Sequence, residues 1–252
     1  MSSMVIEKVG VSSTRRSTRW VIPAVVALLV AGTVVYIGSV DLDSSEIRSL
    51  APEVIFRSLW EHTQLVAVST VLTIAIGVPL GILLTRPGAK GISSMILAVA
   101  NAGQAVPSIG ILVLLAMIFG VGFWMAVIAL VAYALLPVLR NTMVGINQVD
   151  PAIIDAGRGM GMSTREMLFA IELPLSIPVM LAGIRVALIL NVGVATLATF
   201  TNAGGLGSII SAGISLNRMP VLIVGSVLTI CLALIVDWLA GIAEQRLRPK
   251  GI

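Results

Sequence analysis

The segment Asp150–Pro174 reads DPAIIDAGRGMGMSTREMLFAIELP and forms a polar, mixed-charge stretch in an otherwise apolar chain. Its first half carries helix-start signals. Asp150 is a favourable N-cap, and Pro151 suits the first helical position because an N–H there would have no intrahelical partner. Three glycines follow and disfavour a continuous helix. The last of them, Gly161, suits the position just after a helix end, where φ is positive. A short helix ending near Gly161 is therefore predicted.

The second half of the segment contains another helix start. Ser163 and Glu166 have the spacing of a capping box, in which each side chain bonds to the other's backbone N–H, and Pro174 is expected to end the segment. We interpret the whole as a helix–glycine–helix hairpin between two membrane spans. An ordinary loop with one helical turn is the simpler alternative. Isolated helices this short are marginal in water, so the hairpin is expected to rest on a partner surface.

The composition is that of a polytopic membrane protein. Of the 252 residues, 58% are hydrophobic and 11% charged, and the mean hydropathy is +1.07, whereas soluble domains average roughly 25% charged residues. Too few polar residues remain to cover a soluble fold. The single cysteine, Cys231, falls in an apolar stretch and is expected to pack there. The net charge of +4 is attributed to orientation in the bilayer rather than to nucleic acid.

Six stretches are apolar enough to cross a bilayer, which takes about 20 residues. They are predicted at 20–38, 60–84, 92–119, 123–140, 177–200 and 219–242. The third and fourth share one charge-free window, in which Gly120-Val121-Gly122 is the natural turn. The first follows basic residues but precedes no A-x-A cleavage site, so an uncleaved signal anchor is expected, with Ser39–Arg57 as an external loop. Tryptophans near the span ends are interpreted as interfacial anchors: Trp20, Trp60, Trp124 and Trp238.

Lysine and arginine predict the orientation, because short cytoplasmic loops are enriched in them. Twelve flank the spans on one side: Lys8, Arg15, Arg16, Arg19, Arg86, Lys90, Arg140, Arg158, Arg165, Arg246, Arg248 and Lys250. Three lie on the other side: Arg48, Arg57 and Arg218. Both termini and the hairpin are therefore predicted to be cytoplasmic, in a multi-pass protein of the plasma (inner) membrane.

The hairpin resembles the EAA loop of permease subunits of binding-protein-dependent ABC importers, which reads Glu-Ala-Ala, three residues, Gly, nine residues and Ile-x-Leu-Pro. Here Asp155-Ala156-Gly157 is followed by Gly161 and then by Ile171-Glu172-Leu173-Pro174, with both intervals matching. Asp155 replaces Glu, and Gly157 replaces the second Ala. Four other stretches resemble the glycine betaine/carnitine/choline branch: Gln104-Ala105-Val106-Pro107-Ser108, Leu136-Pro137-Val138-Leu139-Arg140-Asn141, Ala182-Gly183-Ile184-Arg185 and Gly204-Gly205-Leu206-Gly207.

This resemblance implies an all-α type I ABC importer permease fold with a cytoplasmic coupling-helix hairpin. A core of five spans would occupy 59–243 with its coupling loop at 141–176, and 20–58 would add a span and an external loop. Residues 1–19 and 244–252 would be cytoplasmic tails. The residues implied to couple the loop to an ATPase are Asp155, Ala156, Gly157, Gly161, Ile171, Leu173 and Pro174.

The resemblance also implies partners and cargo. Two cytoplasmic ABC ATPase subunits would bind ATP and Mg, so that this chain holds no cofactor. A second permease subunit, identical or related, and an external substrate-binding protein would complete the importer in membrane lipid. The implied cargo is an osmoprotectant of the glycine betaine, choline or carnitine type.

Ionisable residues at membrane depth are few, and such residues mark function by default. Arg185 is expected to pair with Asp237 at a similar depth, with snorkelling to the cytoplasmic surface as the alternative. Glu61 and His62 are interpreted as interfacial residues at the outer end of the second span. A lone histidine there is a poor candidate for a proton relay.

Pro107 and Pro137 fall inside the third and fourth predicted spans, where each frees a backbone carbonyl and kinks its helix. Broken helices are tolerated in a bilayer where they face protein or a water-filled cavity. Gln104, Pro107, Pro137 and Asn141 are therefore candidate pathway residues, with a kink needed only for packing as the alternative. Gly204, Gly205 and Gly207 follow the fifth span and are interpreted as an external turn or re-entrant piece near a gate.

Several chemistries are missing from the sequence. It has no G-x-x-x-x-G-K-[ST] phosphate loop, and its only histidine is His62, so neither an ATPase, a Ser/His/Asp enzyme nor a Cys/His metal site is expected. An ion-coupled carrier usually needs buried charges and would leave the hairpin unexplained. A permease for another small solute, a stand-alone channel or carrier, and a non-transporting scaffold remain as alternatives.

Overall fold

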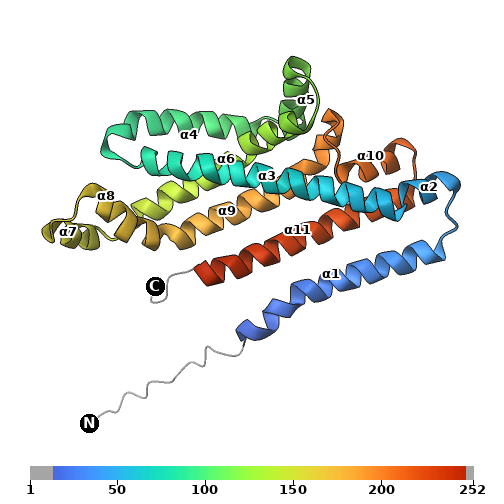
Figure 1. Ribbon diagram of the computed structural model, residues 1–252, viewed down its shortest axis with the longest axis horizontal. Coiled ribbons are helices and arrows are strands. Elements are labelled where there is room, and N and C mark those ends of the chain that lie inside the picture. Colours follow the sequence, from blue (N-terminus) through green and yellow to red (C-terminus); the bar gives the residue numbers. More distant parts are fainter. Residues whose placement is uncertain (1–13, 248–252) are drawn as a thin grey trace, which may run out of the picture.

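The computed structural model describes the backbone of residues 14–247 and the side chains of 20–89 and 91–247, and the regular structure there is helical (Figure 1). The first half contains α1 (Thr14–Ser39), α2 (Ser44–Ser49), α3 (Pro52–Leu84), the 3-10 turn η1 (Pro87–Ala89), α4 (Lys90–Ala105), α5 (Ser108–Phe119) and α6 (Phe123–Asn147). The second half contains α7 (Pro151–Gly159), α8 (Thr164–Met167), the π-helical turn η2 (Leu168–Glu172), α9 (Leu173–Ala195), the 3-10 turn η3 (Thr196–Thr201), α10 (Gly207–Ser215) and α11 (Met219–Leu247).

The number of membrane spans agrees with the sequence. Among the described residues, five helices are long and apolar enough to cross a membrane, and the bent pair α4–α5 makes six if it counts as one span. The spans predicted at 123–140 and 219–242 are shorter than α6 and α11, because both helices continue past the apolar stretch into polar residues. The predicted loop 141–176 therefore begins while the chain is still helical.

The third predicted span, 92–119, is wrong as a single kinked helix. α4 and α5 meet at 96°. Val106 is extended (φ −73°, ψ 133°) and Pro107 is the N-cap of α5, as expected because the residue before a proline avoids the helical region. The turn lets α5 fold back so that Leu112 is buried in the apolar core.

The segment Ser39–Arg57, predicted to be an external loop, is helical over much of its length. Asp43 accepts hydrogen bonds from Ser45 and Glu46 and starts α2 with a capping box, and Pro52 is in the first turn of α3. The hydrogen bonds from the Ser45 side chain and the Glu46 backbone lower the pKa of Asp43. Its carboxylate also pairs with Arg218 at 2.7 Å, which ties α2 to the turn between α10 and α11.

The centre of the bundle consists of α3, α6 and α9, which lie side by side in Figure 1. Small residues let these helices approach closely, as is usual for membrane helices. A Cβ at Gly81 of α3 would lie 2.7 Å from Thr142 Cβ of α6, and a Cβ at Gly183 of α9 would lie 2.7 Å from the Pro137 carbonyl oxygen of α6. A hydrogen bond between two buried polar side chains joins α9 to α3 in this centre, where Asn191 Nδ2 donates to Thr70 Oγ1 at 3.1 Å.

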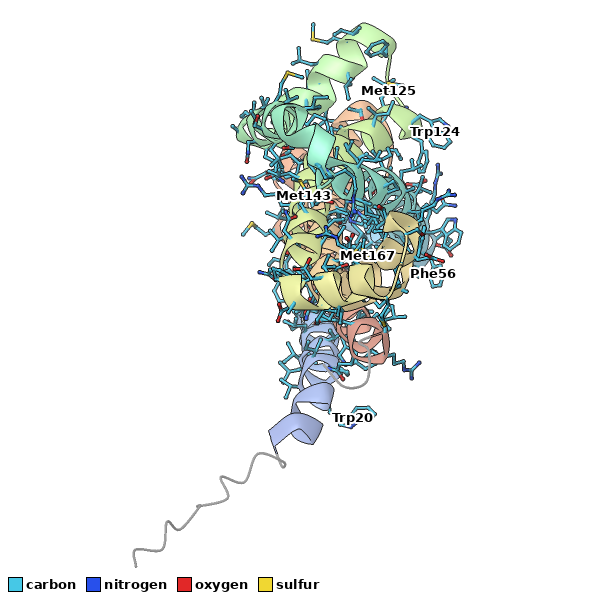
Figure 2. The ribbon with its side chains drawn as sticks, turned by 90° about the vertical axis from the view of Figure 1, so that its left-hand side faces the viewer. Trp20, Phe56, Trp124, Met125, Met143 and Met167 are labelled. Atoms are coloured by element: carbon cyan, nitrogen blue, oxygen red, sulfur yellow. The ribbon has the colours of Figure 1, made fainter. Side chains whose placement is uncertain are left out.

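Helix α1 lies along α11 at the edge of the bundle (Figure 1), and none of its described side chains is buried. Figure 2 shows Trp20, Phe56 and Trp124 at the periphery of the molecule, with exposed fractions of 73%, 76% and 62%. Large apolar side chains in such positions meet lipid in a membrane. The first span is thus an accessory helix beside a packed core.

Candidate functional site

The Asp150–Pro174 hairpin begins with the helix start predicted for it. The Asp150 side chain accepts a hydrogen bond from Ala152 N at 2.8 Å, and Pro151 occupies the first turn of α7. Gly161 has a φ of +79°, which favours glycine because other residues are strained there. Sequence and structure agree on this half of the hairpin.

The capping box is present as well. Ser163 Oγ accepts from Glu166 N at 3.3 Å, and Glu166 Oε2 accepts from Ser163 N at 2.7 Å. This starts α8, but Pro174 does not end the segment as predicted. Helical structure runs on from Thr164 to Thr201, through η2 and α9. Leu173 N–H donates to Leu168 O, five residues earlier, and this widened turn accommodates a proline that lacks an N–H.

The predicted coupling residues fall into an exposed and a packed set. Asp155 and Ala156 lie on the exposed face of α7, where Asp155 pairs with Arg158 at 3.1 Å. Gly157 faces inward, and a Cβ there would lie 3.0 Å from Ile171 Cδ1. Ile171, Leu173 and Pro174 are half-buried. The exposed set can meet a partner, while the packed set holds the hairpin together.

The outer surface of the hairpin combines charge with apolar side chains. Met160 and Phe169 are 74% and 65% exposed. They line an open hollow of about 500 Å³, together with Gly161, Met162, Glu166 and Ala170. Figure 1 places α7 and α8 at one end of the molecule, beyond the central helices and far from α2 and α10. An exposed apolar hollow on such a projection is typical of a protein-docking surface.

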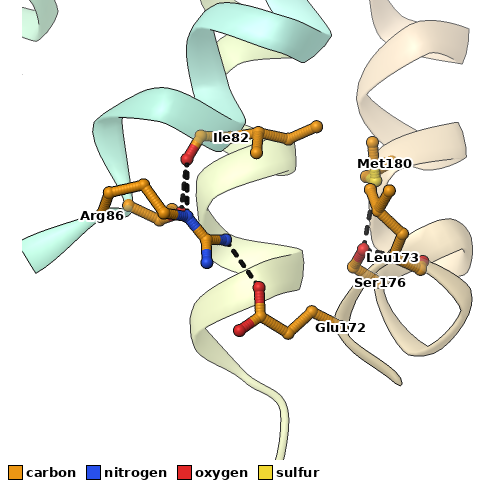
Figure 3. Close-up of polar contacts among 7 residues, drawn as sticks. Ile82, Arg86, Glu172, Leu173, Ser176 and Met180 are labelled. Carbon is orange, nitrogen blue, oxygen red and sulfur yellow. Dashed lines mark hydrogen bonds and ion pairs between the residues drawn. The ribbon is translucent and has the colours of Figure 1, made fainter. Parts of the chain in front are cut away.

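An ion pair that the sequence did not reveal joins this hairpin to α3. Arg86 Nη2 donates to Glu172 Oε2 at 2.6 Å (Figure 3). Glu172 is the variable position of Ile171-Glu172-Leu173-Pro174, so the motif gave no role to it. The sequence did hold one signal for this pair: Arg86 and Glu172 carry opposite charges and flank spans on the same predicted side of the membrane.

Of the candidate pathway residues, Gln104, Pro107 and Pro137 lie at the junction of α4, α5 and α6. Gln104 Nε2 donates to Tyr133 O at 2.8 Å, and Tyr133 is four residues before Pro137. This is the carbonyl that Pro137 leaves unpaired. Asn141 Nδ2 donates to Pro137 O at 2.9 Å and packs against Gly183 instead of joining Gln104. Gln104 and Pro137 are thus brought together, while Pro107 is exposed at the α4–α5 bend.

The glycine loop at the other end is held by two consecutive residues of α3. Gly205 N donates to Glu61 Oε2 at 3.0 Å, and Leu206 N donates to His62 Nδ1 at 3.3 Å. Gly204 and Gly205 have φ values of +76° and +92°. This backbone turn points the N–H groups of Gly205 and Leu206 toward α3. Gly207 starts α10 against η3, where a Cβ would lie 1.8 Å from Thr196 O.

His62, interpreted from the sequence as an interfacial residue, is buried within the protein. Its side chain is 0% exposed, and its Nε2 lies 3.1 Å from Val192 O. Since Nδ1 accepts from Leu206, Nε2 carries the proton and donates to Val192. His62 lies on the same face of α3 as Ser58, Leu65 and Ser69, all buried, and this helical spacing was the signal for its burial.

The pairing predicted for Arg185 is confirmed. Its Nε and Nη2 donate to the two carboxylate oxygens of Asp237 at 2.5 and 2.8 Å. Glu244 approaches Arg185 Nη1 at 3.6 Å. The two-point geometry joins α9 to α11, and snorkelling to the cytoplasmic surface is not needed to satisfy the guanidinium.

The family model that describes a binding-protein-dependent transport system inner membrane component matches residues 77–249. The protein belongs to this family. The matched region runs from the last turns of α3 through the hairpin to α11, and it leaves α1, α2 and most of α3 outside.

Named inner membrane components align with most of the chain. The carnitine transport permease protein OpuCB of Listeria monocytogenes is 42% identical over 77% of this chain and 88% of its own length. The choline transport system permease protein OpuBB of Bacillus subtilis is 39% identical over the same shares. The osmoprotectant import permease protein OsmY of Salmonella typhimurium is 40% identical over 76% of this chain and 81% of its own.

Solved inner membrane components share the fold. A chain of the inward-facing MetNI methionine ABC transporter superposes with a TM-score of 0.70 at 24% identity and covers 82% of this chain and 100% of that one. A chain of an amino acid ABC transporter solved with histidines gives a TM-score of 0.66 at 19% identity and the same coverage. The type I importer permease fold predicted from the sequence is confirmed.

Proposed function

We propose that this permease carries glycine betaine, choline, carnitine or a close relative into the cell as part of an ABC importer. A separate subunit hydrolyses the ATP. The supporting observation for coupling is the hairpin, which presents Asp155, Ala156 and the hollow beside Met160 at one end of the molecule. The supporting observation for the cargo is the identity of about 40% to permeases named for these solutes.

The proposed partners follow from the family to which the chain belongs. Cytoplasmic ATPase subunits dock on α7 and α8, a second permease subunit completes the pathway, and an external binding protein delivers the solute. Closure of the ATPase dimer on ATP pushes the two hairpins together. Because Gly157 packs on Ile171, this push reaches η2 and α9, and the spans rock from inward-open to outward-open.

We assign the pathway to the junction of α4, α5 and α6. Gln104, Pro107 and Pro137 border it, and Asn141 lies one turn further along α6, against Gly183 of α9. The turn containing Gly204, Gly205 and Gly207 forms its outer gate. Support for the pathway comes from the bend at Pro107, which breaks the helix within a predicted apolar span.

The pathway is proposed to bind its cargo weakly. A tight quaternary-ammonium site needs several aromatic rings around one cation. The aromatic pair found among the described residues is Phe123–Trp124, with ring centroids 5.5 Å apart. Trp124 is 62% exposed at the start of α6, so it is not enclosed. Selectivity then resides in the binding protein. A weak site in the pathway also lets the cargo leave quickly into the cytoplasm.

Uptake of radiolabelled solute tests the cargo. Cells expressing the full system are expected to accumulate betaine, choline or carnitine only when the binding protein is present. Transport of a sugar without any uptake of these solutes would overturn the assignment of cargo. Co-purification with an ATPase separates an importer from a stand-alone channel or carrier, and solute-stimulated ATP hydrolysis separates it from a scaffold.

Labelling tests the proposed orientation, in which both termini and the hairpin are cytoplasmic. Ser163 and Ser44 are both exposed, on α8's N-cap and at the start of α2. In a Cys231→Ser background, Ser44→Cys is expected to react with an impermeant maleimide from outside and Ser163→Cys only after permeabilisation. Reaction of both cysteines from the same side would contradict the six-span topology.

A further inference from the structure

The Arg86–Glu172 ion pair connects two segments that are 86 residues apart in sequence. Arg86 follows the end of α3, and Glu172 is the last residue of η2. The side chains are only 26% and 13% exposed. Arg86 Nε also donates to Ile82 O at 3.3 Å (Figure 3), so the last turn of α3 orients the guanidinium that binds the carboxylate.

The hairpin on one side of Glu172 is packed as a unit. Met162 N donates to Gly157 O at 3.1 Å across the glycine turn. Met167 is 6% exposed, and a Cβ at Gly157 would lie 3.6 Å from its side chain and 3.0 Å from that of Ile171. A displacement of α7 therefore moves Ile171, the residue beside Glu172.

The bundle on the other side of Glu172 is anchored. Ser176 is 0% exposed, and a Cβ on Gly145 of α6 would lie 3.0 Å from Ser176 Cβ. Ser176 Oγ donates to Leu173 O at 2.9 Å and lies 3.2 Å from Met180 Sδ (Figure 3). The first turn of α9 is thus fixed to its neighbour.

The joint between hairpin and bundle is η2. Its π-helical hydrogen bond from Leu173 to Leu168 replaces the ordinary one, and Pro174 has no N–H to offer Ala170. Because η2 has fewer ordinary i to i−4 hydrogen bonds than the flanking helices, the angle between the hairpin and α9 can change there. Turns of π-helix are also frequent at functional sites.

We propose that Arg86 and Glu172 are positioning residues that fix the angle of the hairpin against α3 and pass its movement to the spans. The inference rests on the proposed function, since it assumes that the hairpin receives the movement of an ATPase. The pair does not touch the cargo. It sets how much of the hairpin's displacement reaches α3 and α9.

The test uses the complete importer in liposomes and measures solute uptake per ATP hydrolysed. Arg86→Gln and Glu172→Gln are each expected to lower this ratio by about tenfold, a usual size for coupling between sites, while ATP hydrolysis continues. The charge exchange Arg86→Glu with Glu172→Arg is expected to restore most of the ratio. Arg218→Gln, which breaks the Arg218–Asp43 pair at the opposite end, is the matched control and should leave the ratio unchanged.

A second readout does not depend on the cargo. Spin labels at Ile153 of α7 and Leu83 of α3, both exposed and outside the hollow beside Met160, report the angle of the hairpin in the assembled complex. The single variants are expected to broaden the distance distribution, and the exchange to narrow it again. The inference would be overturned if both single variants kept the wild-type ratio of uptake to ATP hydrolysis and the wild-type distances. It would also be overturned if the charge-exchange variant assembled but had a ratio as low as that of the single variants. Lack of uptake by the wild type would contradict the proposed cargo alone, because the distances still report on the pair.

Discussion

Gly183→Ala is expected to lower the melting temperature of the purified protein by roughly 6–12 °C, corresponding to about 3 kcal/mol in the free energy of unfolding. The added Cβ would lie 2.5 Å from Asn141 Cβ and 2.7 Å from Pro137 O. The second of these is backbone in the interior of α6, so it cannot turn away as a flexible side chain would. The helices α6 and α9 must separate, and the contact that centres the bundle is lost.

Gly193→Ala provides the matched control in the same helix. Nothing lies within 4 Å of a Cβ at Gly193, and alanine is the better helix former by about 1 kcal/mol. Its melting temperature should therefore equal or exceed that of the wild type. Thermal unfolding in detergent, followed by the loss of the monodisperse peak, measures both variants. Equal melting temperatures for the two would show that α6 and α9 do not pack this closely.

Asp155→Lys and Gly161→Val are expected to abolish most uptake while the protein still reaches the membrane. The Asp155–Arg158 pair is exposed, with both side chains more than half accessible, and such helix pairs contribute only about 0.3–0.5 kcal/mol. Loss of uptake on charge reversal would therefore report on a partner's surface. Gly161 has a φ of +79°, where a β-branched residue costs about 1–3 kcal/mol and would reshape the turn between α7 and α8.

Two variants make this prediction specific. Asp155→Asn removes the charge without reversing it and should retain part of the uptake. Gly159→Ala changes a glycine two residues from Gly161, but with ordinary φ and open space around its Cβ, and should behave as wild type. Uptake of labelled solute, normalised to the amount of protein in the membrane, measures all four. Normal uptake by Asp155→Lys and Gly161→Val would remove the hairpin from the mechanism.

Local chemistry made much of this molecule predictable from the sequence. The N-cap at Asp150, the positive φ of Gly161 and the capping box of Ser163 with Glu166 depend on atoms a few residues apart, so the pattern alone specifies them. The membrane spans depend on how each stretch partitions between lipid and water, and this follows from the amino-acid composition of the stretch. Arg185 and Asp237 were paired correctly because two opposite charges at one membrane depth have few other partners.

The outcome at each proline depended on contacts that the sequence does not display. Pro107 and Pro137 carry the same local signal, yet the chain turns by 96° at one and α6 continues through the other. At Pro137 the freed Tyr133 carbonyl receives the Gln104 amide from α4, so the continuous helix leaves no unpaired acceptor there. No pattern within α6 predicts that donor.

The sequence by itself therefore determined five of the six spans and, in the hairpin, the two helix starts and the glycine turn, because these follow from short-range geometry and from transfer between water and lipid. The tertiary structure decided which distant groups meet. Glu61 and His62 hold the Gly205–Leu206 backbone from 144 residues away, and Arg86 reaches Glu172 across 86 residues. Such pairs form only where packing brings two segments to the same place, and burying a polar or charged group is much less costly when it has a partner.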